Sequence, residues 1–242
     1  MSVSSFHLSQ PISTILFKLI GSYKPWLYLL ESIFLFSCLL LTDSRAGLSS
    51  TLVAILLIFI LSSSGTSTHK KTKFSVFLIG ISILAALLQL SGYSITHRLT
   101  LPFELDQRFL AYPAIFHAIA TQPILGYGLG SFSEVFMFFR PNSMKVIFDR
   151  AHSDFLQLCF EIGMPAACIV LFSMFTTFKK LIHYFKTCTK HKYEILSGLG
   201  VLILFTLHGL VDFPFQIPAL GYTLSAILGF SLGTGWIEKH SK

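Results

Sequence analysis

Charged residues are scarce in this sequence: Asp, Glu, Lys and Arg make up 12% of its 242 residues, about half the share of an average soluble domain. The residues after Met1 also lack the basic and apolar regions of a secretory signal peptide. Hydrophobic residues instead account for 53% of the chain, and the mean hydropathy is +0.70. These values exclude an ordinary soluble domain and predict an integral membrane protein.

Cysteine is scarce too, and none of the four residues belongs to a CxxC pair. The sequence therefore offers no zinc motif and no disulfide framework, and we expect the cysteines to behave as small buried hydrophobic residues. The net charge is +7, but no basic segment interleaved with aromatic residues resembles a nucleic-acid-binding surface. We expect no nucleic acid partner and interpret the basic residues as determinants of membrane topology.

Long apolar runs dominate what is present. Six of them can each cross a bilayer as a helix, and they cover residues 26–42, 47–63, 74–92, 155–178, 195–213 and 217–236. Apolar residues at helical spacing within 12–20 add an interfacial helix or the remains of another span. The predicted fold is an all-α integral membrane protein with an N-terminal segment 1–25, a membrane domain 26–236 and a tail 237–242.

Lysines gather on one side of the membrane if the six spans alternate. They precede the first span, separate the second from the third and the fourth from the fifth, and close the chain. The positive-inside tendency makes this side cytoplasmic. The C-terminus is therefore predicted to be cytoplasmic, and the longest loop, 93–154, extracytoplasmic.

All the arginines fall on the opposite side, as Arg45, Arg98, Arg108, Arg140 and Arg150. Arginine offers a flat fork of donors that suits phosphate. The alternative is ion pairing with the acids of the loop, Glu104, Asp106, Glu134 and Asp149. A loop this long is usually functional or disordered, and its apolar residues predict a helix over 104–121, which Pro113 bends or restarts.

The loop continues with "QPILGYGLGSF", in which Gly126, Gly128 and Gly130 alternate. No strand precedes these glycines, so they do not form a dinucleotide-binding fingerprint. One interpretation is a tight turn between two surface helices. The other is a backbone surface that phosphate can approach closely.

Three stretches form a recognisable set. "LTDSRAGLSS" (41–50) opens a span, and "RFLAYPAIFHAIATQPILGYGLGSF" (108–132) is an arginine-led helix that ends in a glycine turn. In "DRAHSDFLQLCFEIG" (149–163), His152 and Ser153 are followed by nine residues and then Gly163. Together they resemble the O-antigen ligase and O-antigen polymerase superfamily, with a looser match at "HGLVDFPFQIPALGY" (208–222). Ala46 and Met164 depart from the family pattern, and Met164 departs from its ligase form in particular.

The resemblance implies a glycosyltransferase at the outer face of the bacterial inner membrane. Its donor would be an undecaprenyl-diphosphate-linked glycan, and its acceptor lipid A-core, a growing glycan or a protein hydroxyl. The transfer would be inverting and metal-independent, with no cofactor. Family members carry more spans before the Ser-Arg stretch, so we expect this chain to be the C-terminal half of a longer or split protein, with a separate N-terminal half as a partner.

The resemblance also suggests roles for individual residues. Arg45 and Arg108 would neutralise the leaving diphosphate, and His152 would accept the proton of the acceptor hydroxyl because imidazole titrates near neutral pH. Arg150 lies beside His152 in the sequence and is a further candidate for substrate binding. The alternatives are an Arg45 that reaches the interface beside Asp43 and a His152 that faces water.

Two polar stripes enter the apolar runs. Asp154, Gln157 and Glu161 follow helical spacing, as do His208 and Asp212. Polar residues at membrane depth generally face protein or a wet cavity, so we expect both stripes to line a cavity under the outer loop. Asp212 would orient either His208 or Arg150. The rival functions are a transporter, although no internal repeat is found, and an inactive fragment that packs against partners.

Overall fold

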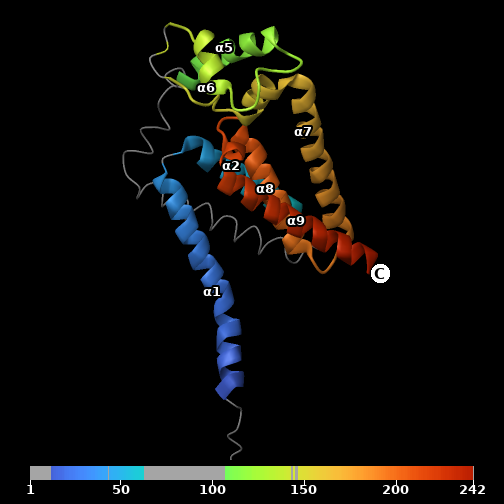
Figure 1. The fold of residues 1–242 in the computed structure, drawn as a ribbon. Helices are drawn as coiled ribbons and strands as arrows, with labels where there is room; N and C mark the ends of the chain where they lie inside the picture. The colour runs from blue at the N-terminus through green and yellow to red at the C-terminus, as the bar shows by residue number, and fades with distance from the viewer. Residues whose placement is uncertain (1–11, 43, 63–106, 143, 145–146, 242) are drawn as a thin grey trace, which may run out of the picture. The chain divides into compact units, whose positions relative to one another are not determined.

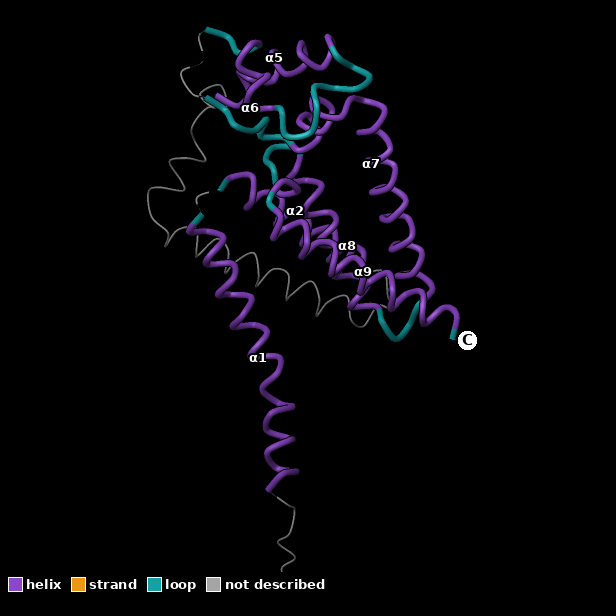
Figure 2. Tube along the Cα trace, viewed as in Figure 1, coloured by secondary structure: helices purple, strands orange, loops and turns teal. Residues whose placement is uncertain are grey.

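A computed structural model describes residues 12–42, 44–62, 107–142, 144 and 147–241, and these residues form helices joined by turns (Figures 1 and 2). The helices are α1 (Ile12–Leu41), α2 (Arg45–Ser62), α5 (Gln107–Thr121), α6 (Phe132–Val135), η2 (Phe136–Phe138), α7 (Asp154–Thr187), α8 (Lys192–Gly209), η3 (Pro214–Gln216) and α9 (Pro218–His240). The described part of the chain contains no strand, as predicted. It divides into two compact units, residues 1–44 and 45–242.

Two helices, α7 and α9, are long and apolar enough to cross a membrane, and shorter apolar helices cover Leu27–Leu41 and Ala46–Ser62. The expected span 74–92 and much of loop 93–154 lie outside the described residues. The expected N-terminal element and the first span form one continuous helix, α1. The run 195–213 is not a single helix, because α8 ends at Gly209 and a turn precedes Pro214. The six-span arrangement therefore stays a prediction.

Within the second unit, α8 packs against α2, α7 and α9 (Figure 1). The outer-loop helices α5 and α6 pack on α7, where Ile115, Phe132, Phe136 and Phe160 are at most 1% exposed. Pro113 lies inside α5 without ending it. The described part of the outer loop thus has its own apolar core, which fixes the start of α7.

The opposite end of the bundle is closed by the carboxylate of Glu238, near the end of α9. It accepts backbone N–H bonds from Thr189, Lys190 and His191 at 2.7 to 3.2 Å. These bonds attach α9 to the α7–α8 turn and satisfy donors that the start of a helix leaves unpaired.

The cysteines are only partly as expected. Cys188 is buried and Cys159 half-buried, but Cys38 and Cys168 are exposed on the surfaces of α1 and α7. The expectation of burial was wrong for these two, because their positions fall on helix faces that no other described element covers.

A break in α7 explains the glycine turn of the outer loop. Gly163 has φ 79° and ψ 162°, so the helical hydrogen bonds are interrupted there. The turn fills the gap: Tyr127 N–H donates to Phe160 O at 3.0 Å, and Gly128 N–H donates to Glu161 O at 2.9 Å. These amides are occupied by protein backbone, which favours the tight-turn interpretation over the phosphate surface.

Replacing Gly163 by alanine is expected to destabilise the protein by about 2 kcal/mol or more, because only glycine adopts this backbone conformation cheaply. A Cβ atom at this position would also lie 2.1 Å from Ile124 O. Thermal unfolding of the purified protein in detergent measures the change. Gly229→Ala is the matched control, since a Cβ atom there meets nothing within 4 Å and alanine favours the helix. Equal melting temperatures for the two variants would contradict the conclusion that position 163 requires glycine.

Candidate functional site

The segment before α7 places His152 in an unusual backbone conformation. His152 has φ +49°, in the left-handed region that non-glycine residues rarely adopt. Ser153 then takes an extended conformation and caps α7, its hydroxyl accepting Leu156 N–H at 3.5 Å. Tyr112 of α5 donates its hydroxyl to His152 O at 3.0 Å. Such strain persists where surrounding contacts hold it, which is common at functional sites.

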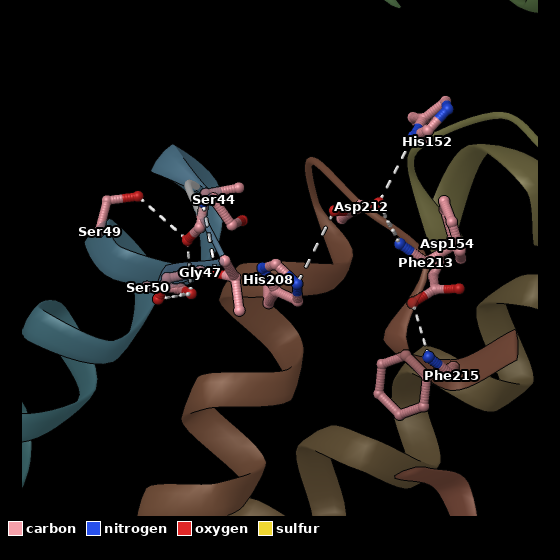
Figure 3. Close-up of polar contacts among 12 residues, drawn as sticks. Ser44, Gly47, Ser49, Ser50, His152, Asp154, His208, Asp212, Phe213 and Phe215 are labelled. Carbon is pink, nitrogen blue, oxygen red and sulfur yellow. Dashed lines mark hydrogen bonds and ion pairs between the residues drawn. The ribbon is translucent and has the colours of Figure 1, made fainter. Parts of the chain in front are cut away.

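The imidazole of His152 is held by a carboxylate and two aromatic rings. Its Nδ1 lies 3.4 Å from Oδ1 of Asp212 (Figure 3). The rings of Phe148 and Phe213 meet it edge-on, with centroids at 5.2 and 5.1 Å. Since an ionised carboxylate only accepts hydrogen bonds, Nδ1 carries the proton in the neutral ring and Nε2 keeps a free lone pair. This tautomer suits a general base.

Asp212 joins two imidazoles. Besides His152, its carboxylate accepts Phe213 N–H at 3.1 Å, and its Oδ2 lies 3.9 Å from Nε2 of His208. Nδ1 of His208 is buried and has no hydrogen-bond partner among the described residues. The backbone carbonyl of Asp212 also accepts Asp154 N–H at 3.1 Å. The turn after α8 is therefore attached both to His152 and to the first residue of α7.

Arg150 also contacts the ring of Phe213. Its Nη1 donates to Oε1 of Gln216 at 2.8 Å, and its guanidinium is 5.0 Å from the centroid of the Phe213 ring. Arg140 donates to the backbone carbonyl of Met144. The two arginines whose side chains the structure describes thus bond to an amide and a carbonyl. Glu104 and Asp106, two of the acids in the ion-pair alternative, lie outside the described residues.

A cavity of about 680 Å³ opens under the outer loop. Its lining residues are Leu129, Gly130, Phe132, Ser133, Asp149, Arg150, Asp154, Phe155, Gln157, Leu158, Glu161, Val170, Met174, Phe215 and Gln216. The first polar stripe lines it as expected, and Gln157 donates to Glu161 at 2.8 Å. The second stripe does not line this cavity: Asp212 contacts both His208 and His152, and none of the three is among the lining residues.

The structure brings only some of the predicted site residues together. His152, His208 and Asp212 form one cluster, and Arg150 lies beside it. Arg45 begins α2 and Arg108 lies in the first turn of α5, but their side chains lie outside the described residues. The described residues contain no group of three His, Cys, Asp or Glu arranged for a metal ion.

Three residues that support the site were not predicted from the sequence. Tyr112, Phe213 and Gln216 hold the backbone of His152, its ring and Arg150 respectively. Phe213 directly precedes Pro214 and Gln216 follows it by two residues, and proline disfavours a helical conformation for the residue before it. That proline was the available sign that the span ends early and that its last residues form a turn.

One comparison identifies a family. A family model described as O-antigen ligase matches residues 31–172, which is 142 of the 242 residues and more than half of the chain. The match includes Arg45, Arg108, Arg150 and His152 and ends before His208 and Asp212. No curated protein and no solved structure matches the chain.

Proposed function

The chain belongs to the O-antigen ligase family, and we propose that it transfers a glycan from a polyprenyl diphosphate to an acceptor hydroxyl. The family acts on lipid-linked glycans and their acceptors, in ligation or polymerisation of surface polysaccharide. The observation that carries the proposal is the half-buried contact between His152 and Asp212, at the start of an apolar helix and beside a cavity.

In the proposed reaction, the acceptor oxygen attacks the anomeric carbon of the donor sugar from the face opposite the diphosphate. The bond between that carbon and the diphosphate oxygen breaks, and the diphosphate leaves with the electron pair. Nε2 of His152 takes the proton of the acceptor hydroxyl. Asp212 holds the ring in the required tautomer and stabilises the imidazolium that forms, in the manner of other His–Asp pairs. His208 supports Asp212 from its other oxygen.

The leaving diphosphate needs positive charge. We assign this role to Arg45 and Arg108, because arginine binds phosphate oxygens through two parallel hydrogen bonds and stabilises charge as it develops. Arg150 supports binding near the cavity. The chemistry uses protein side chains alone, without a metal ion or cofactor.

The reaction is placed at the outer face of a bacterial inner membrane. The lysine-rich segments, including the α7–α8 turn, would then be cytoplasmic, as would the C-terminus. The partners are an undecaprenyl-diphosphate-linked glycan, an acceptor such as lipid A-core, a growing glycan or a protein hydroxyl, and membrane lipids.

The test uses right-side-out and inside-out membrane vesicles that contain the chain, with any N-terminal partner, and an undecaprenyl-diphosphate-linked oligosaccharide with a radiolabelled sugar. A water-soluble core oligosaccharide or short glycan is added outside. We expect labelled product with right-side-out vesicles only, together with released undecaprenyl diphosphate. Product from inside-out vesicles would reverse the orientation, and no product from either would favour a transporter or an inactive fragment.

A further inference from the structure

The side chain of Asp154 is buried, but only one of its two carboxylate oxygens accepts a hydrogen bond. The residue is 6% exposed, and its Oδ2 accepts Phe215 N–H at 3.0 Å (Figure 3). Its Oδ1 has no hydrogen-bond partner among the described residues. A buried carboxylate oxygen without a donor is costly. Asp154 also belongs to the wall of the cavity under the outer loop, together with Gln216. Turning the carboxyl toward the cavity would let a ligand there supply the donor that Oδ1 lacks.

The charge of the cavity decides which ligand this is. Its ionisable lining residues are three acids, Asp149, Asp154 and Glu161, and one cation, Arg150. When all are ionised their sum is two negative charges. Arg150 is moreover already bonded to Gln216. A diphosphate placed here would meet more repulsion than attraction, so the cavity does not suit the charged part of the donor.

The same lining suits hydroxyl groups. Carboxylate oxygens accept from hydroxyl donors, and the amide of Gln216 can both donate and accept, whereas the amide of Gln157 is already bonded to Ala151 N–H and to Glu161. Phe155 and Phe215 add aromatic surface beside these groups, in the mixture of apolar walls and few polar groups that is common in small-molecule sites. Leu158, Val170 and Met174 of α7 add apolar wall to the cavity.

We infer that this cavity binds the uncharged sugar hydroxyls of the acceptor glycan, with Oδ1 of Asp154 accepting one of them. The identification of the bound glycan as the acceptor rests on the proposed transfer function, whereas the binding of sugar hydroxyls does not. The two substrates then bind in different places: the acceptor glycan lies in the cavity, and the arginines at the starts of α2 and α5 bind the diphosphate of the donor. The carboxylates of the cavity also keep a second diphosphate out of the acceptor position.

The experiment measures binding of methyl glycosides of glucose, galactose, mannose and N-acetylglucosamine to the full chain in nanodiscs by saturation-transfer-difference NMR. We expect at least one glycoside to bind and inorganic pyrophosphate not to displace it. Asp154→Asn, which removes the charge and half of the acceptor capacity, should weaken binding by about tenfold or more. The matched control is Glu134→Gln, an exposed acid of the same loop outside the cavity lining, which should bind as the wild type does.

A second variant keeps the inference testable if Asp154→Asn does not fold. Ser133 is exposed and lines the cavity, so Ser133→Trp should block entry of the glycoside without disturbing the buried core. Wild-type glycoside binding in the folded variants, displacement by pyrophosphate, or no binding of any glycoside would overturn the inference. If glycosides bind as expected while the vesicles transfer nothing, the sugar site stands and the proposed transfer function falls.

Discussion

Replacing His152 by alanine is expected to lower glycan transfer by about two to four orders of magnitude, the usual contribution of a positioned general base. The loss should lie in the rate at saturating donor and acceptor, because His152 is not among the residues that line the cavity. The measurement is the initial rate of transfer from a lipid-linked glycan by the purified chain with any N-terminal partner. Binding of the donor should be close to that of the wild type.

The control for this variant is His117→Ala. His117 is an exposed histidine of α5 whose ring meets Phe139 edge-on at 6.0 Å, and its removal should leave transfer unchanged. Thermal unfolding of His152→Ala checks that the loss of packing against Phe148 and Phe213 has not unfolded the loop. A folded His152→Ala protein that transfers at the wild-type rate from pH 6 to 8 would show that His152 is not the base.

Local sequence pattern was enough to find the start of α7 and the first polar stripe. The change from polar to apolar residues after Ser153 predicted the start of α7 within one residue, and helical spacing predicted that Asp154, Gln157 and Glu161 share a face, which proved to line the cavity. Both features depend on residues close together in the chain, where helical geometry is decided.

The contact between His152 and Asp212 could not be predicted in the same way. The two residues are 60 positions apart, and their approach depends on the turn between α8 and η3 and on the left-handed conformation of His152. The sequence left Asp212 with two candidate partners, His208 and Arg150. The structure brings it to His208 and also to His152, which is not one of the predicted partners. The prediction assumed that helical spacing continues to Asp212, but α8 ends at Gly209.

The break in α7 was missed for a related reason. Residues 155–178 read as one apolar run, and hydropathy does not reveal a change of backbone conformation inside such a run. Gly163 and Pro165 marked the place, but each is tolerated within membrane helices when neighbouring groups satisfy the freed backbone. Here the glycine turn of the outer loop supplies those partners, so the kink and the turn determine each other across about 35 residues of sequence.

Replacing Asp212 by alanine is expected to lower the transfer rate by about two to three orders of magnitude, since the ring of His152 loses the acceptor that fixes its tautomer and the charge that stabilises its imidazolium form. Asp212→Asn should recover part of this loss, because the amide oxygen can still accept from Phe213 N–H and from Nδ1 of His152. The attachment of the turn to α7 should survive both changes, since Asp154 N–H binds the backbone carbonyl of Asp212 and not its side chain.

A double variant distinguishes this positioning role from a structural one. If Asp212 acts through His152, the chain carrying both His152→Ala and Asp212→Ala should transfer no more slowly than His152→Ala alone, because residues that act as a unit lose their effect once rather than twice. A purely structural Asp212 would instead lower the rate of the double variant further and would reduce the melting temperature together with the rate. Transfer by Asp212→Ala at the wild-type rate would remove the carboxylate from the mechanism and leave His152 to be oriented by Phe148 and Phe213 alone.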